Sequence, residues 1–167
     1  MRSILAGLLV TALLAGCASY SGIGLVAGAS TGADVEALMG QPAESLARPD
    51  GGRVLYYPRG PLGRDMFAVL LGVDGRLQAV EQRLTDANIA KIVLGTTTAA
   101  QVRELLGPSL IHSSLPGLER NVWGYRMGDR VLPYILWVQF SPDGIVREVI
   151  KLRENERDDT GGRGRHW

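Results

Sequence analysis

The chain has 167 residues, of which 46% are hydrophobic and 21% are charged, and it contains one cysteine and two histidines. Residues 1–16 hold a single cation, Arg2, followed by an apolar run that is shorter than the ~20 residues of a membrane-spanning helix. This layout indicates a secretory signal peptide. The other 151 residues carry 17 basic and 17 acidic side chains, so charge gives no reason to expect nucleic acid as a partner. A single cysteine excludes an internal disulfide and a multi-cysteine metal site, and we expect no metal and no other cofactor.

The cysteine, Cys17, directly follows Leu14-Ala15-Gly16. This segment resembles a bacterial lipobox, which implies that Cys17 carries a diacylglycerol on its sulfur together with a further acyl chain such as palmitate, and becomes the first residue after cleavage. Ala18 rather than aspartate follows, which by the enterobacterial sorting pattern implies the outer membrane. We therefore predict a lipid anchor in the outer membrane, with the protein facing the periplasm. The alternative is a free thiol at the end of an ordinary signal peptide.

Two segments that lie 67 residues apart share the same spacing of glycine, threonine, valine, leucine and glycine. Such self-similarity indicates an internal duplication, with one copy over residues 28–84 and a second over residues 85–153. Residues 17–27 then form a lipidated tether, and residues 154–167, which are rich in charge and glycine, form a tail that we predict to be disordered. The matched positions are Gly28, Thr31, Val35, Leu38 and Gly40 in the first copy, and Gly95, Thr98, Val102, Leu105 and Gly107 in the second.

Each matched position has a role in forming a short helix. Thr31 and Thr98 are candidate N-caps, and Asp34 or Gln101 three residues later completes a capping box. The apolar residues that follow have the spacing of one buried helix face, and a glycine in the left-handed region ends each helix. The apolar positions are Val35, Leu38 and Met39 in the first copy and Val102, Leu105 and Leu106 in the second, and the glycines are Gly40 and Gly107.

Three strand-like runs follow each helix, with an Asp-Gly turn before the last. A further helix over residues 85–94 begins the second copy. The sequence thus predicts an α+β fold of two tandem repeats, each with one or two short helices packed on a three-stranded antiparallel sheet. The predicted strands are Arg53–Tyr57, Met66–Leu71 and Arg76–Leu84 in the first copy, and Asn121–Arg126, Val131–Phe140 and Ile145–Leu152 in the second.

The motif residues resemble the SmpA/OmlA family, also known as BamE. Members are small outer-membrane lipoproteins of the barrel-assembly machinery with a two-helix, three-strand fold, so the resemblance implies an accessory role in that machinery. Two tandem copies also resemble the β-lactamase inhibitor protein, which implies a surface that grips a protein partner. The resemblance rests on Gly28, Thr31, Val35, Leu38, Gly40 and Pro42, and on Gly95, Thr98, Val102, Leu106, Gly107 and Pro108.

Eight of the ten aromatic residues fall on predicted strands. Trp123, Tyr125 and Tyr134 are candidate partner-binding anchors if they lie on the open sheet face, whereas inward they fill the core. His112-Ser113-Ser114 lacks a nearby acid to orient the histidine, and we interpret residues 109–119 as a polar surface loop. We therefore expect no catalysis.

The predicted function is that of a non-catalytic outer-membrane lipoprotein, a binding or scaffold module that assists β-barrel assembly. The alternative is a membrane-tethered periplasmic inhibitor or binder of one protein. We expect as partners the membrane lipid, through Cys17, and a periplasmic protein.

Overall fold

The structure is a computed structural model that describes residues 20–129 and 131–154. The predicted signal peptide, the lipidation site Cys17 and tail residues 155–167 lie outside the described residues. Within the described ranges, no helix combines the length and the apolar character that crossing a bilayer requires.

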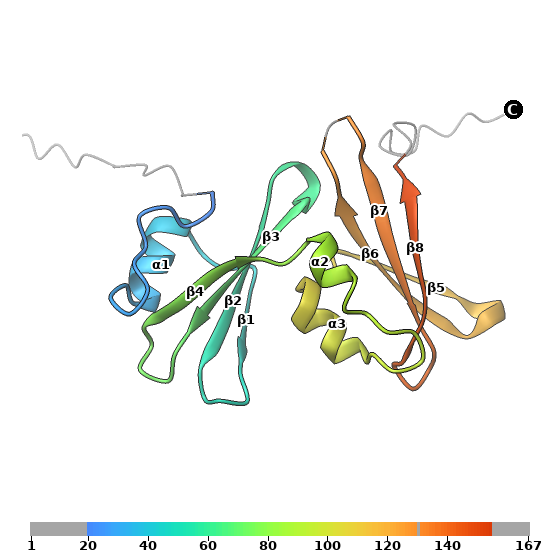
Figure 1. Ribbon diagram of the computed structural model, residues 1–167, viewed down its shortest axis with the longest axis horizontal. Helices are drawn as coiled ribbons and strands as arrows, with labels where there is room; N and C mark the ends of the chain where they lie inside the picture. Colours follow the sequence, from blue (N-terminus) through green and yellow to red (C-terminus); the bar gives the residue numbers. More distant parts are fainter. Residues whose placement is uncertain (1–19, 130, 155–167) are drawn as a thin grey trace, which may run out of the picture.

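The chain forms two successive units, each built from helix followed by sheet (Figure 1). In each unit the strands pair antiparallel in sequence order, β1-β2-β3-β4 and β5-β6-β7-β8. The first unit contains α1 (Gly32–Met39), β1 (Glu44–Ala47), β2 (Arg53–Arg59), the 3₁₀ turn η1 (Pro61–Gly63), β3 (Asp65–Leu71) and β4 (Leu77–Gln82). The second contains α2 (Asp86–Ile89), α3 (Ala99–Leu106), β5 (Ile111–Leu115), the 3₁₀ turn η2 (Pro116–Leu118), β6 (Arg120–Met127), β7 (Tyr134–Phe140) and β8 (Val146–Arg153).

The predicted α+β class with three-stranded sheets is wrong. The described chain is mostly β, with two four-stranded antiparallel sheets and three short helices. The additional strands are β1 and β5, and β5 occupies part of the segment 109–119 that the sequence presents as a loop. Both are short strands at a sheet edge with polar side chains, so they lack the alternating apolar pattern that reveals a strand in a sequence.

Two further boundaries differ from the prediction. The helix predicted over residues 85–94 is a single turn, α2, although Thr85 does cap it by accepting a hydrogen bond from the Asn88 amide at 3.2 Å. Strand β7 begins at Tyr134, because Val131 and Leu132 belong to the turn that precedes it.

The predicted capping boxes of α1 and α3 are confirmed. The Thr31 and Thr98 hydroxyls accept from the amides of Asp34 and Gln101 at 3.3 and 3.2 Å, and both reciprocal side-chain bonds are present. Each threonine also bridges to the last strand connection of its own unit, Thr31 to Arg76 and Thr98 to Ile145. The same local chemistry therefore starts both helices and places each one against its sheet.

The glycines that end α1 and α3 have positive φ, as predicted, but their ψ angles are extended. Gly40 has φ 82° and ψ −172°, and Gly107 has φ 84° and ψ −176°. Only glycine occupies that region readily. At Gly107 the environment adds a second constraint, because a Cβ there would lie 2.6 Å from Cγ of Met66, in the other unit.

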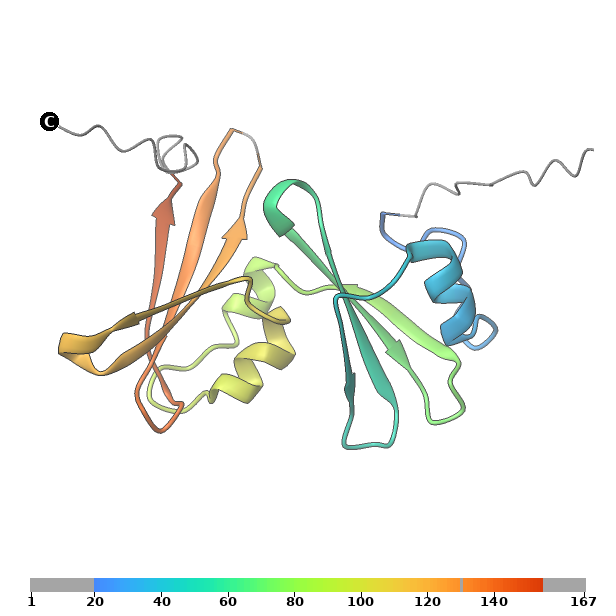
Figure 2. The same cartoon turned by 180° about the vertical axis from the view of Figure 1, so that it is seen from behind.

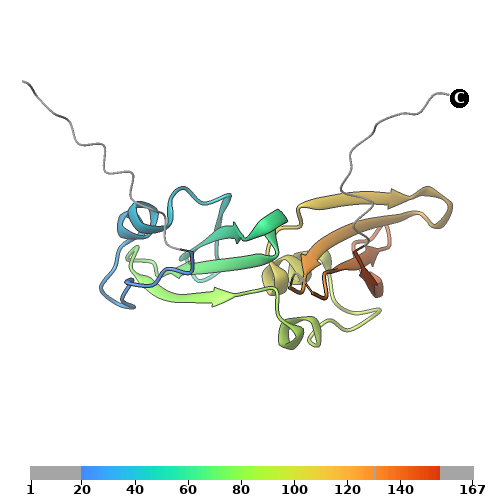
Figure 3. The ribbon, with the colours of Figure 1, turned by 90° about the horizontal axis from the view of Figure 1, so that it is seen from above.

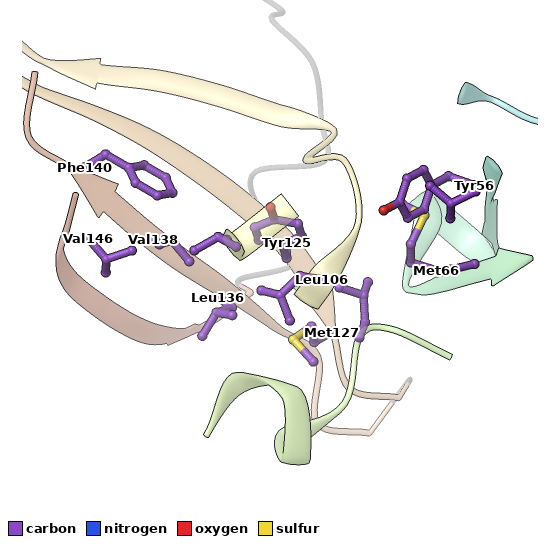
Figure 4. Close-up of a cluster of buried hydrophobic side chains, with 13 residues drawn as sticks. Tyr56, Met66, Leu106, Tyr125, Met127, Leu136, Val138, Phe140 and Val146 are labelled. Carbon is purple, nitrogen blue, oxygen red and sulfur yellow. The ribbon is translucent and has the colours of Figure 1, made fainter. Parts of the chain in front are cut away.

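The layers stack in the order α1, first sheet, α3, second sheet (Figures 1 and 2). Viewed from above, α3 lies between the two sheets (Figure 3). The larger core cluster accordingly combines residues of both units, and Figure 4 shows Leu106 of α3 between Tyr125 of the second sheet and Tyr56 and Met66 of the first. A smaller cluster lies between α1 and the outer face of the first sheet.

We predict that Gly107→Ala destabilises the protein more than Gly40→Ala. Both substitutions introduce backbone strain of about 1–3 kcal/mol. Gly107→Ala additionally forces a Cβ against the buried Met66, which adds an overpacking cost of about 1–3 kcal/mol. Chemical denaturation of the two variants measures this difference, and equal losses would mean that α3 does not approach the first sheet so closely.

Candidate functional site

The two sheets differ in how their second face is covered. In the first sheet, one face carries Leu55 and Tyr57 and packs on α1, while the opposite face carries Tyr56 and Met66 and packs on α3. In the second sheet, the face that carries Tyr125 packs on α3. No helix or strand of the described ranges lies over its opposite face (Figures 1 and 3). We call this surface the open face.

The open face has an apolar centre. Cross-strand partners in an antiparallel sheet share a face, and Trp137 is paired with Gly124 on one side and Ile150 on the other. The Trp137 ring lies over Gly124, where an added Cβ would be 2.7 Å from ring atom Cζ3. The centre therefore presents a tryptophan fixed against the backbone. The open-face residues are Ile111 and Ser113 of β5, Val122, Gly124 and Arg126 of β6, Ile135, Trp137 and Gln139 of β7, and Glu148, Ile150 and Leu152 of β8.

Tyr56 and Ala68 are cross-strand partners on the covered face of the first sheet, and Gly124 and Trp137 are the corresponding pair on the open face. Each pair joins one aromatic residue with one small residue, but the two types are exchanged between the strands. The aromatic residue is on the second strand of the first sheet and on the third strand of the second sheet. The open face is thus a differently packed version of a surface that takes a helix in the first unit.

Charged residues border the apolar centre at both ends. Arg120 contacts Glu148 at 3.7 Å and donates to Gln139 at 3.2 Å. At the other end, Arg126 Nε lies 2.9 Å from Glu154 Oε1, and Glu154 also pairs with Arg64 of the first unit. An apolar centre within a polar rim is the usual anatomy of a protein-binding surface.

The ion pair of Arg64 with Glu154 also connects the two units. Arg64 Nη1 donates to the Met127 carbonyl at 2.9 Å, and its guanidinium pairs with Glu154, whose side chain is 15% exposed. Burial opposes ionisation of Glu154, but the hydrogen bonds from Arg126 and Arg64 outweigh it and hold the pKa of this carboxyl below its ordinary value. Glu154, predicted as the first residue of the disordered tail, thus makes ordered contacts with both units.

The three aromatic anchors predicted from the sequence all lie on the α3 side of the second sheet. Tyr125 is 3% exposed and donates its hydroxyl to the Gly107 carbonyl at 3.2 Å, and burial raises its pKa. Trp123 packs on Phe140, with ring centroids 4.7 Å apart. Tyr134 is half-buried against the same cluster, with Lys151 Nζ 5.2 Å from its ring centroid. The strands hold the predicted aromatics together, but on the covered face.

Trp137 is the open-face aromatic that our selection from the sequence missed. Alternation along β7 places Trp137 opposite in direction to Leu136 and Val138, which are buried. Its cross-strand partner Gly124 is a signal in the sequence, since a glycine within a strand indicates close approach of another group. The pairing register of β6 and β7 is needed to place Gly124 opposite Trp137.

The predicted motif residues are structural. Gly28 and Gly95 donate their amides to the carbonyls of Leu77 and Val146 at 2.7 and 2.8 Å, which joins each helix entry to the last strand of its sheet. The other motif residues of the two repeats lie in or next to α1 and α3 and shape those helices: Thr31, Val35, Leu38, Gly40, Pro42, Thr98, Val102, Leu106, Gly107 and Pro108.

The described residues contain no group of three or more histidine, cysteine, aspartate or glutamate side chains placed to hold a metal ion. His112 is exposed on edge strand β5, where its Nε2 lies 3.0 Å from the Ser109 carbonyl and its ring packs edge-on to Trp123. The arrangement of the open face is suited to binding through shape and apolar contact.

No family model and no curated protein matches the chain. Among solved structures, it is similar to a DUF4309 family protein, YjgB, from Bacillus subtilis subsp. subtilis str. 168, with 19% identity over 79% of this chain and 84% of that chain and a TM-score of 0.33. The function must therefore be inferred from the residues of the chain itself.

We predict that Glu154→Gln destabilises the protein at neutral pH by about 1–2 kcal/mol, because it removes the charge that Arg64 and Arg126 share. The lowered pKa means that this stabilisation is present above the carboxyl's ordinary range and is lost as pH falls through the folded-state value. The difference between wild type and variant should therefore shrink in acid, as measured by denaturation across pH.

Glu148→Gln is the matched control for this measurement. Glu148 is more exposed and has one contact at 3.7 Å, so its loss should cost less than about 0.5 kcal/mol at any pH. A Glu154→Gln effect that is independent of pH would contradict the ion-pair assignment.

Proposed function

We propose that this protein is a non-catalytic lipoprotein of the outer membrane, which binds a protein partner in the periplasm through the open face. The observation that carries the proposal is the unequal covering of two equivalent sheet faces, since the first is buried by α3 and the second is left with an apolar centre. Sheet faces of this kind are normally covered, and a face that no helix or strand covers indicates an interaction site.

The covered face indicates the kind of partner. It takes a two-turn helix with a closely approaching glycine at its end, Gly107, and an ion pair at its side, Arg103 with Glu44. We infer that the open face takes an amphipathic helix of the partner. Trp137, Ile150 and Leu152 are suited to contact its apolar side, and Arg120 is placed to meet its polar margin.

The resemblance of the two copies to BamE-type motifs supports a partner within the barrel-assembly machinery. Under that proposal the protein is an accessory to the assembly of β-barrel outer-membrane proteins. The alternative resemblance, to the β-lactamase inhibitor protein, supports a single soluble periplasmic protein as the partner. The experiment on the open face described below separates these two alternatives.

Cys17→Ser should abolish lipid attachment and leave the precursor uncleaved, because a hydroxyl does not take the place of the thiol in the thioether. Metabolic labelling with palmitate, followed by isolation of wild type and variant, measures this directly. Incorporation of label into the Cys17→Ser protein would contradict the lipoprotein proposal.

Charge on the open face should abolish partner binding without unfolding the protein. We expect the variant that combines Ile150→Glu and Leu152→Glu to lose partner capture from gently solubilised envelopes, since Leu152 is 53% exposed and its replacement leaves the core intact. Mass spectrometry identifies the captured proteins, with barrel-assembly components supporting the accessory role and one soluble enzyme the inhibitor role.

Val73→Glu is the control, because Val73 is a highly exposed apolar residue on a turn of the first unit, away from the open face. A photo-crosslinker at position 150 should join the same partner, and one at position 73 should not. Undiminished capture by the Ile150→Glu, Leu152→Glu protein would rule out the open face as the binding surface.

A further inference from the structure

One edge of the molecule carries two neighbouring hairpin tips with exposed apolar side chains. Hairpins β2–β3 and β6–β7 point to the same side in Figure 1, and Arg64 joins them through the Met127 carbonyl at 2.9 Å. Leu62 is at the tip of the first, and Val131 and Leu132 are at the tip of the second. We call this the anchor edge, because the predicted tether leads to it.

The part of the predicted tether between Cys17 and this edge is short. Tyr20 donates its hydroxyl to Asp65, accepts from Arg59 Nε at 3.3 Å through its carbonyl, and packs edge-on against Phe67 with ring centroids 5.9 Å apart. These contacts fix Tyr20 beside the β2–β3 hairpin. Only three residue steps separate Cys17 from Tyr20, so their Cα atoms are at most about 11 Å apart.

The tip of the β6–β7 hairpin is held in place with its apolar residues outward. The Asp129 carboxylate accepts from the amides of Val131 and Leu132, both at 2.8 Å, and these hydrogen bonds hold the pKa of Asp129 below its ordinary value. The two side chains are nevertheless 75% and 63% exposed. The hydrogen bonds of Asp129 thus hold the turn in a conformation that exposes the adjacent apolar side chains of Val131 and Leu132.

Leu62 is displayed at the cost of backbone strain. It has a φ of 61°, between Gly60 and Gly63, which have positive φ themselves, and its side chain is 45% exposed. A bulky residue in this region is unfavourable, and a glycine there would be free of strain. Such strain at an exposed position is a mark of function, and here it maintains an apolar tip.

We propose that the anchor edge rests on the bilayer that holds Cys17, with Leu62, Val131 and Leu132 in the lipid headgroup region. This inference rests on the lipidation proposed above, since the acylated residue brings the bilayer within the reach of the short tether. Apolar side chains that enter the boundary between headgroups and acyl chains add to the anchoring of a lipidated protein. The contact fixes the orientation of the protein, which tethering alone does not.

The test uses the lipidated full-length protein in phosphatidylcholine vesicles that contain doxyl-labelled lipid as a quencher. Cys17 is the only cysteine of the sequence, so acylation leaves an introduced cysteine as the only free thiol for an environment-sensitive fluorophore. Val131→Cys places the probe at the anchor edge. Val73→Cys is a matched control, since Val73 is also a turn valine, 77% exposed, at the opposite end of strand β3 from the β2–β3 hairpin.

We expect quenching several-fold stronger at position 131 than at position 73. Combining Leu62→Gly with the probe at 131 should weaken that quenching while leaving the fold intact, because glycine relieves the strain at this position. Equal quenching at positions 131 and 73 would overturn the proposal and leave the lipid anchor standing. Wild-type protein that takes up the thiol label at Cys17 would instead remove the lipid anchor, and the proposal with it.

Discussion

The structure depends on one helix that is buried on both sides. Helix α3 contacts the second sheet through Val102 and Leu106, which are fully buried, and its last turn meets the first sheet at Gly107. Asn88 supports it from α2, since Nδ2 donates to the carbonyls of Arg83 and Leu105 at 3.0 and 3.1 Å. Because the same helix fills one core cluster shared by both units, the two units cannot separate without exposing the Tyr56 face of the first sheet.

This shared helix gives the stack a direction. The second unit follows the first by repeating the order helix, sheet, so the end of the stack at α1 is a helix and the other end is a bare sheet face. A two-fold arrangement of the same units would bury both inner faces against each other and leave equivalent ends. Repeats that follow one another in this way leave an unsatisfied surface at a terminal unit unless a partner or a capping element covers it.

The sequence determines the local elements well. Threonine caps, their reciprocal partners and Asp-Gly turns act within a few residues, and the structure contains them at Thr31, Thr98 and Thr85 and at Asp74-Gly75 and Asp143-Gly144. The edge strands β1 and β5 are different, because they are short, they carry few apolar side chains, and each pairs with a neighbour on one side only, β2 and β6 respectively. Composition and periodicity carry almost no signal for such strands.

The face of a strand is the other quantity that a single sequence does not determine. Alternation separates Trp123 and Tyr125 from Gly124, and Trp137 from its neighbours, but it does not say which set meets a helix. That assignment follows from where α3 docks, and α3 itself offers apolar residues to both sheets. The sequence therefore groups Trp123, Tyr125 and Tyr134 on strands of one sheet but leaves their face open, and the structure places them on the side that α3 covers.

The position of α3 also determines the order in which the chain can complete its structure. Each sheet is a meander of sequence neighbours, so its hairpins can form early and locally. The first sheet nevertheless keeps a bare apolar face until residues 99–107, some 17 residues beyond β4, have folded against it. During synthesis from the amino end, the chain therefore passes through an interval in which a nearly complete sheet exposes apolar surface. In that interval the chain is most prone to aggregate and gains most from binding a chaperone.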